Sequence, residues 1–175
     1  SLTGEDFDIT ISNNSPKEYA HIFNRDPSDS TLSKILEFDV IVFKNCFPTT
    51  KITSDEHLQE IMNYYTEVKK GIGRFPNKKF IVFTPPPVRK EATTSEYAAR
   101  ARKLAQWMNS PEYLGDSTNL EVFDFYSYLA DENGENMNML RRDYAPLFYR
   151  DSHPNRKANK EIAPIFVDFI LNNSK

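Results

Sequence analysis

The stretch "FDVIVFKNCFP", residues 38–48, decides the fold. Its first six residues are almost all apolar and rich in β-branched and aromatic side chains, which is typical of a strand buried on both faces of a parallel sheet. Two further runs have the same character, "KFIVFT" at 79–84 and "LEVFDF" at 120–125. A fourth run, "FDITI" at 7–11, alternates apolar and polar residues, so we expect it at the edge or periphery of the sheet.

Helical patterns separate the three buried runs. Thr53 and Glu56 have the spacing of a capping box, and the apolar residues that follow recur on one face of a helix. Gly71 or Gly73 should end this helix, because glycine is the residue that most often follows a helix C-terminus. A shorter helix is expected over residues 15–22.

Two more helices complete the pattern. Thr93 and Glu96 open one of them, and the last runs over about 155–172, with Ile165 among its apolar positions. Pro164 interrupts the last helix, so we expect a kink or a fresh start there. Strands that alternate with helices predict a three-layer α/β/α sandwich with a mainly parallel, flavodoxin-like sheet. At 175 residues the chain fits one domain over 1–175.

Composition excludes several classes of function. The 22 basic and 25 acidic side chains give a net charge of −3, which argues against nucleic acid as a partner. A single cysteine, Cys46, excludes an intrachain disulfide and a multi-cysteine metal cluster. Five glycines and no glycine-rich phosphate loop give no reason to expect a nucleotide cofactor, and we expect no metal. No apolar run is long enough to predict a membrane span.

The segment "DSHPN", residues 151–155, follows the last predicted strand and precedes the last helix. His153 could act as a general base, and Asp151 would then fix its tautomer and stabilise the imidazolium. Asn155 is a good helix N-cap and would hold the histidine at a rigid boundary. The same residues equally fit an ordinary helix cap with His153 on the surface, and spacing alone does not separate the two interpretations.

Asn45 and Cys46 follow the first buried run. In an open parallel sheet, ligands bind at the carboxyl ends of the strands, where the Asn45 amide could donate to a developing oxyanion. It could also be a turn residue that bonds its own backbone. The Cys46 thiol could act as a nucleophile with His153, but free cysteines at such positions are more often small buried apolar residues, and we expect that of Cys46.

Taken together, these segments resemble the SGNH or GDSL hydrolase superfamily over residues 38–172. The most specific part is "DSHPNRKANKEIAPIF", since those enzymes place their catalytic Asp and His just before the C-terminal helix. The resemblance implies that His153 is the general base and Asp151 its orienting carboxylate. It also implies that Asn45 is the oxyanion donor, in a block that usually reads G-x-N-D.

The chain departs from the superfamily pattern in three places. Cys46 stands where that block usually has Asp, and the D-x-H spacing is one residue shorter than the common D-x-x-H. The superfamily's nucleophilic Ser follows the first strand in a G-D-S-L-like block, whereas this chain opens with "SLTG". Either Ser1 is the tail of such a block and the nucleophile, or the natural first strand and its Ser are missing from this chain.

The resemblance therefore implies a serine hydrolase acting on esters, such as a carbohydrate O-acetyl esterase, without a cofactor. The partner would be a small-molecule or carbohydrate ester. The alternatives are an O-acyltransferase, a non-catalytic carbohydrate- or ligand-binding domain with the same fold, and, less favoured, a flavodoxin-like response or nucleotide domain. The compartment stays open, and a processed chain would suit secretion or the periplasm.

Overall fold

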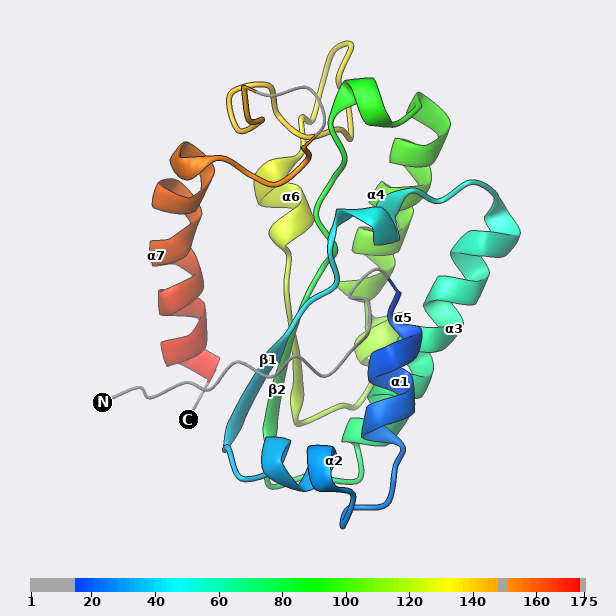
Figure 1. Ribbon diagram of the computed structural model, residues 1–175, viewed down its shortest axis with the longest axis vertical. Helices are drawn as coiled ribbons and strands as arrows, with labels where there is room; N and C mark the ends of the chain where they lie inside the picture. The colour runs from blue at the N-terminus through cyan, green and yellow to red at the C-terminus, as the bar shows by residue number, and fades with distance from the viewer. Residues whose placement is uncertain (1–14, 148–150, 174–175) are drawn as a thin grey trace.

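The protein is an α/β structure built on a small parallel sheet (Figure 1). The structure, a computed structural model, describes residues 15–147 and 151–173. In this part the three strands are β1 (Val40–Phe43), β2 (Lys79–Phe83) and β3 (Leu120–Phe123), hydrogen-bonded in the order β1-β2-β3. Ile41 pairs with Phe80, and Val82 with Val122. All three predicted buried strands are thus confirmed, and the run at 7–11 lies outside the described residues.

One face of the sheet carries the larger core. Side chains alternate between the two faces of a strand, so Ile41, Phe80 and Val122 point to the same side. They pack under the helices α1 (Lys17–Phe23), α2 (Ser30–Ile35), α3 (Asp55–Ile72), α4 (Ser95–Met108) and α5 (Pro111–Leu114). Full burial of each large apolar side chain contributes about 1.5–3 kcal/mol, so this layer holds the helices to the sheet.

The opposite face is covered by α7 (Arg156–Asn173), as Figure 1 shows, and α6 (Phe125–Leu129) follows β3 at its carboxyl end. Ile81 and Phe123 point to this side, where Ala158 and Ile162 of α7 are buried against them. An aromatic cluster extends the contact, with the ring centroids of Phe83 and Phe166 4.6 Å apart. Helices on both faces of the sheet make a three-layer α/β sandwich, as the sequence predicts.

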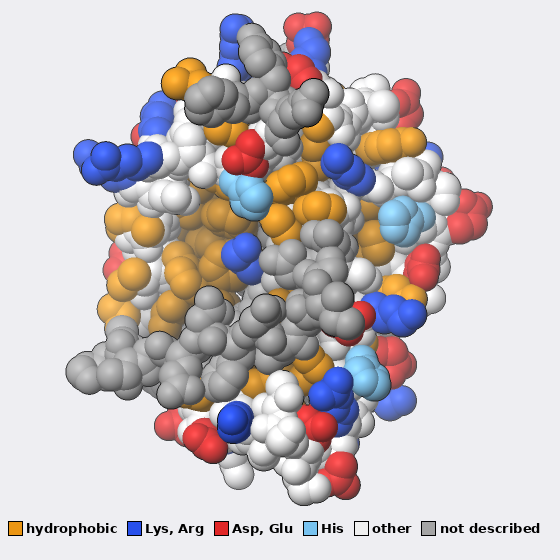
Figure 2. All heavy atoms as spheres, in the orientation of Figure 1, with side chains coloured by type: hydrophobic (Ala, Val, Ile, Leu, Met, Phe, Trp, Pro, Cys, Tyr) orange, Lys and Arg blue, Asp and Glu red, His pale blue; other side chains and the backbone are white. Residues whose placement is uncertain are grey.

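Much of the apolar surface of α7 stays open to solvent. Ile165, one of the apolar positions of the predicted helix, is 40% exposed, and Val167 and Leu171 are more exposed still. Figure 2 shows apolar side chains gathered on the side of the molecule where α7 lies. The described part of α7 turns Ala158 and Ile162 toward the sheet, together with Phe166, Phe169 and Ile170, and Ile165 lies outside that face.

Pro164 lies inside α7, which runs as one helix through it. The expected fresh start at this proline is therefore wrong. Proline lacks the backbone N–H that would bond the carbonyl of Lys160, and it costs about 3 kcal/mol in a helix interior. Both Pro164 and Lys160 are exposed, so water can solvate that carbonyl.

Two of the predicted helix starts are one residue early. Ser54, not Thr53, caps α3, and its hydroxyl accepts from the backbone N–H of His57 at 3.1 Å. Thr94, not Thr93, caps α4 in the same way. The predicted end of α3 is confirmed, since Gly73 is its C-cap. Among the described residues, no helix is long and apolar enough to span a membrane.

Candidate functional site

The segments that leave the sheet at its carboxyl edge come together there. Cys46 Sγ after β1 lies 3.6 Å from Nε2 of His153, although 107 residues separate them in sequence. After β2, the backbone N–H of Arg89 donates to the hydroxyl of Ser152 at 3.5 Å. The structure therefore brings "KNCFP" and "DSHPN" to one place.

Asp151 holds His153 by two hydrogen bonds to one oxygen. Its Oδ1 accepts from the backbone N–H of His153 at 2.9 Å and lies 2.5 Å from the ring Nδ1. The bond from the His153 backbone, followed by that from its ring, holds the pKa of Asp151 below its usual value. The carboxylate therefore stays charged at neutral pH and can fix the imidazole tautomer and stabilise an imidazolium.

The far side of the imidazole is also occupied. Nε2 faces the Cys46 thiol, and the ring of Phe47 meets the imidazole edge-to-face with centroids 5.1 Å apart. The His153 side chain is 64% exposed and that of Asp151 is 47% exposed, whereas Cys46 is buried. Ligands can therefore reach the histidine from solvent while the thiol forms the floor beneath it.

Asn155 anchors the histidine segment, as the sequence predicts. Its Oδ1 accepts from the backbone N–H groups of Lys157 and Ala158, which caps the start of α7. Its Nδ2 donates to the carbonyl oxygens of Asp143 and Ala145, at 2.9 and 3.0 Å. Because the cap is tied to α7 on one side and to the preceding loop on the other, the histidine two residues away sits on a rigid turn.

Asn45 is fully buried beside this site. Its Oδ1 accepts a hydrogen bond from the hydroxyl of Tyr65 at 2.8 Å, which fixes the orientation of the amide. The proposed oxyanion role of Asn45 stays a prediction. Ser1, the predicted nucleophile, lies outside the described residues.

The sequence left two interpretations of Cys46 open, a small buried apolar residue and a thiol that acts with His153. We expected a small buried apolar residue, and it is buried, but it also contacts the imidazole. The clue was in the sequence: Cys46 follows the same strand as Asn45, at the sheet edge to which "DSHPN" was assigned. In the described part of the chain, no group of acidic, His or Cys side chains is arranged to hold a metal ion.

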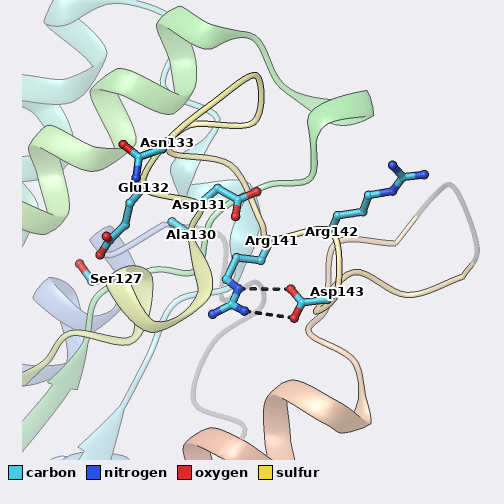
Figure 3. A pocket seen from close by; sticks show the side chains of 8 residues that line it. All are labelled: Ser127, Ala130, Asp131, Glu132, Asn133, Arg141, Arg142 and Asp143. Atoms are coloured by element: carbon cyan, nitrogen blue, oxygen red, sulfur yellow. Dashed lines mark hydrogen bonds and ion pairs between the residues drawn. The ribbon is translucent and has the colours of Figure 1, made fainter.

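An open polar groove (Figure 3) lies next to Asn155, the residue that caps α7. It has a volume of about 490 Å³ and is lined by residues from α6 and the loops that follow, including Asp131, Glu132 and Arg142. Arg141 and Asp143 on its rim form a two-bond ion pair, at 3.2 and 3.1 Å. His153 does not line this groove. The groove is connected to the histidine segment by the hydrogen bond that the Asn155 side chain donates to the backbone carbonyl of Asp143.

Comparison with known proteins gives a likeness of fold. A solved structure from Streptococcus pneumonia, described as that of a "putative platelet activating factor", superposes with a TM-score of 0.52 at 14% sequence identity. The match covers 73% of this chain and 59% of that one, so this chain spans about three-fifths of its length. No protein-family profile matches the sequence, and no curated protein does. At this identity the likeness supports the α/β sandwich alone.

Proposed function

We propose that this protein is an SGNH-like hydrolase that cleaves an acyl ester, with His153 and Asp151 as its acid–base pair. The observation that carries the proposal is the bond of 2.5 Å between Asp151 Oδ1 and His153 Nδ1 at the carboxyl edge of the sheet. It is supported by the position of Asn45 on the same edge and by the likeness of fold.

The pair can move a proton in both halves of an ester cleavage. With Nδ1 bonded to the carboxylate, Nε2 is the basic nitrogen and takes the proton of the attacking group. The imidazolium, stabilised by Asp151, then gives that proton to the leaving alcohol. Such general acid–base catalysis contributes about 10²–10⁴-fold to the rate.

The proposed substrate is a small O-acyl ester, such as an O-acetyl group on a carbohydrate. This choice rests on the superfamily resemblance and on the exposure of His153, which lets a large alcohol remain in solvent while its acyl group reacts. An O-acyltransferase would use the same pair and differ only in passing the acyl group to a second alcohol in place of water. A serine nucleophile, for which Ser1 is the candidate, would follow from the same resemblance.

Hydrolysis of para-nitrophenyl acetate tests the proposal. We expect His153→Ala to lower kcat/KM by about 10²-fold or more and Asp151→Asn to lower it by a smaller factor. His21→Ala is the matched control, because His21 is an exposed histidine in the last turn of α1, and it should leave the rate unchanged. Equal rates for the wild type and His153→Ala would refute the proposal.

A non-catalytic binding domain is the second candidate. It is favoured by Ser152, the serine next to His153 in the chain. This residue is buried and its hydroxyl accepts a hydrogen bond from the Arg89 backbone N–H, so the hydroxyl is not open to a substrate. A fluorophosphonate serine probe separates the two functions. Stoichiometric labelling of one mapped serine would exclude the binding-only function, and absence of both labelling and ester hydrolysis would favour it.

A further inference from the structure

Three side chains stand in line at the sheet edge: the Asp151 carboxylate, the His153 imidazole and the Cys46 thiol. The two links are 2.5 Å, from Oδ1 to Nδ1, and 3.6 Å, from Nε2 to Sγ. This is the arrangement of a nucleophile, a base and an orienting acid, with sulfur in the first position.

The hydrogen bonds determine which nitrogen can accept a proton. Asp151 is ionised at neutral pH, because the hydrogen bond from the His153 backbone, followed by that from its ring, holds the pKa of the carboxyl group below its usual value, and a carboxylate only accepts hydrogen bonds. It therefore cannot donate to Nδ1, and the ring must carry its proton on Nδ1. The other nitrogen, Nε2, is then the acceptor in the neutral ring, and it faces the thiol S–H.

Two contacts keep the thiol and the imidazole in register. The ring of Phe47, the residue after Cys46, packs edge-to-face on the imidazole. The backbone carbonyl of Cys46 accepts from the N–H of Thr49 at 3.1 Å, at the start of the short 3-10 helix η1 (Phe47–Thr50). The backbone that carries the thiol is therefore held beside the histidine by a hydrogen-bonded turn.

We propose that Cys46 is the nucleophile that His153 activates, so that the reaction passes through a thioester in place of a serine ester. The inference rests on the proposed function, since it names the attacking group for that acyl transfer. The substrate class that it implies is an activated or short-chain acyl ester whose carbonyl carbon can reach a sulfur recessed behind an exposed imidazole.

Every proton in this cycle is accounted for. The Cys46 thiol gives its proton to His153 Nε2 as Sγ bonds the acyl carbon, and the C–O bond of the ester breaks as Nε2 returns that proton to the leaving alcohol. Water then gives a proton to Nε2 and bonds the acyl carbon. The S–C bond breaks, and the sulfur regains the proton from Nε2. The net reaction is ester plus water to acid plus alcohol, without an oxidant or reductant.

The first test is kinetic and uses para-nitrophenyl acetate. Cys46→Ala should lower kcat/KM by about 10²-fold or more, as far as His153→Ala does, because members of a catalytic unit are not additive. Intact mass measured on rapidly quenched wild type should show an acetyl group on Cys46 that hydroxylamine removes. If Cys46→Ala keeps the wild-type rate while His153→Ala loses it, the thiol inference is overturned and the proposed function stands.

The second test needs no ester and remains decisive if hydrolysis is absent. Iodoacetamide should alkylate Cys46 of the folded wild type at least about ten times faster than Cys46 of folded His153→Ala, since the thiolate is the reactive form. His21→Ala should react at the wild-type rate. Equal rates in the wild type and His153→Ala, with circular dichroism showing both folded, would overturn the inference.

Discussion

The hydrogen bond between Tyr65 and Asn45 should govern both stability and the geometry of the sheet edge. The Tyr65 hydroxyl donates to Asn45 Oδ1 at 2.8 Å, and both side chains are fully buried. Burial raises the pKa of Tyr65 well above its usual value, so the phenol keeps its proton at neutral pH and remains a donor. Tyr65→Phe removes this donor and keeps the ring that packs edge-to-face on Tyr113.

The expected loss follows from burial. A hydrogen bond contributes about 0.5–1.5 kcal/mol to the free energy of unfolding. When its loss leaves a buried polar group short of a hydrogen-bond partner, the loss of stability rises toward about 1–3 kcal/mol. We expect Tyr65→Phe to lower the free energy of unfolding by about 1–2 kcal/mol. For a chain of this size that corresponds to a fall in Tm of roughly 2–8 °C. Urea unfolding and a thermal melt, both followed by circular dichroism, measure it.

The neighbouring residue provides a matched control. Tyr64 is on the same helix, and its hydroxyl also donates at 2.8 Å, to Glu60 near the surface. Tyr64→Phe should change the free energy of unfolding by less than about 0.5 kcal/mol, since water replaces the lost partner. If Asn45 donates to an oxyanion, Tyr65→Phe should also lower kcat on para-nitrophenyl acetate while Tyr64→Phe does not. Equal destabilisation by the two variants would refute the reasoning.

Two further predictions concern charge and packing. The hydrogen bond from Lys157, above all, holds the pKa of Asp143 below its usual 3.8. This carboxylate therefore stabilises the fold at higher pH and loses that effect as the pH falls through its folded pKa. In urea titrations at several pH values, Asp143→Asn should flatten the fall in unfolding free energy below about pH 4, and an unchanged slope would count against the prediction. Gly71→Ala should lower Tm although alanine favours a helix by about 1 kcal/mol, because a Cβ there would lie 2.8 Å from the carbonyl oxygen of Phe23. Gly73→Ala, whose nearest contact is 3.3 Å, should lower Tm less, and a higher Tm for Gly71→Ala would contradict the close packing of α1 on α3.

The strands were the most predictable part of the fold. Each is a short, continuous apolar run, and hydrophobic patterning identifies such runs without knowledge of their neighbours. The helix starts were less certain, since Thr53 and Ser54 are both good caps and only the backbone geometry selects between them. Short helices such as α2 and α5 were missed because each contains fewer than two turns, too little for a periodic pattern.

The site was predicted in part. The pairing of Asp151 with His153 is local in sequence, so the D-x-H spacing could indicate it. The contact between Cys46 and His153 joins two loops that are distant in sequence, and no local sequence pattern gives the distance between their side chains. The exposure of Ile165 could not be predicted for a related reason. The helical period gives the apolar face of α7, but not which part of that face the sheet covers.

The contact between Cys46 and His153 also has a consequence for the stage of folding at which the site forms. The thiol and the imidazole are separated by 107 residues, and the strands β2 and β3 lie between them in the sequence. Contacts of such long sequence separation carry a large loop-closure cost and are rewarded late in folding. A nascent or partly folded chain would therefore carry the Cys46 thiol without its imidazole partner, and the contact between the two groups would form at a late stage of folding.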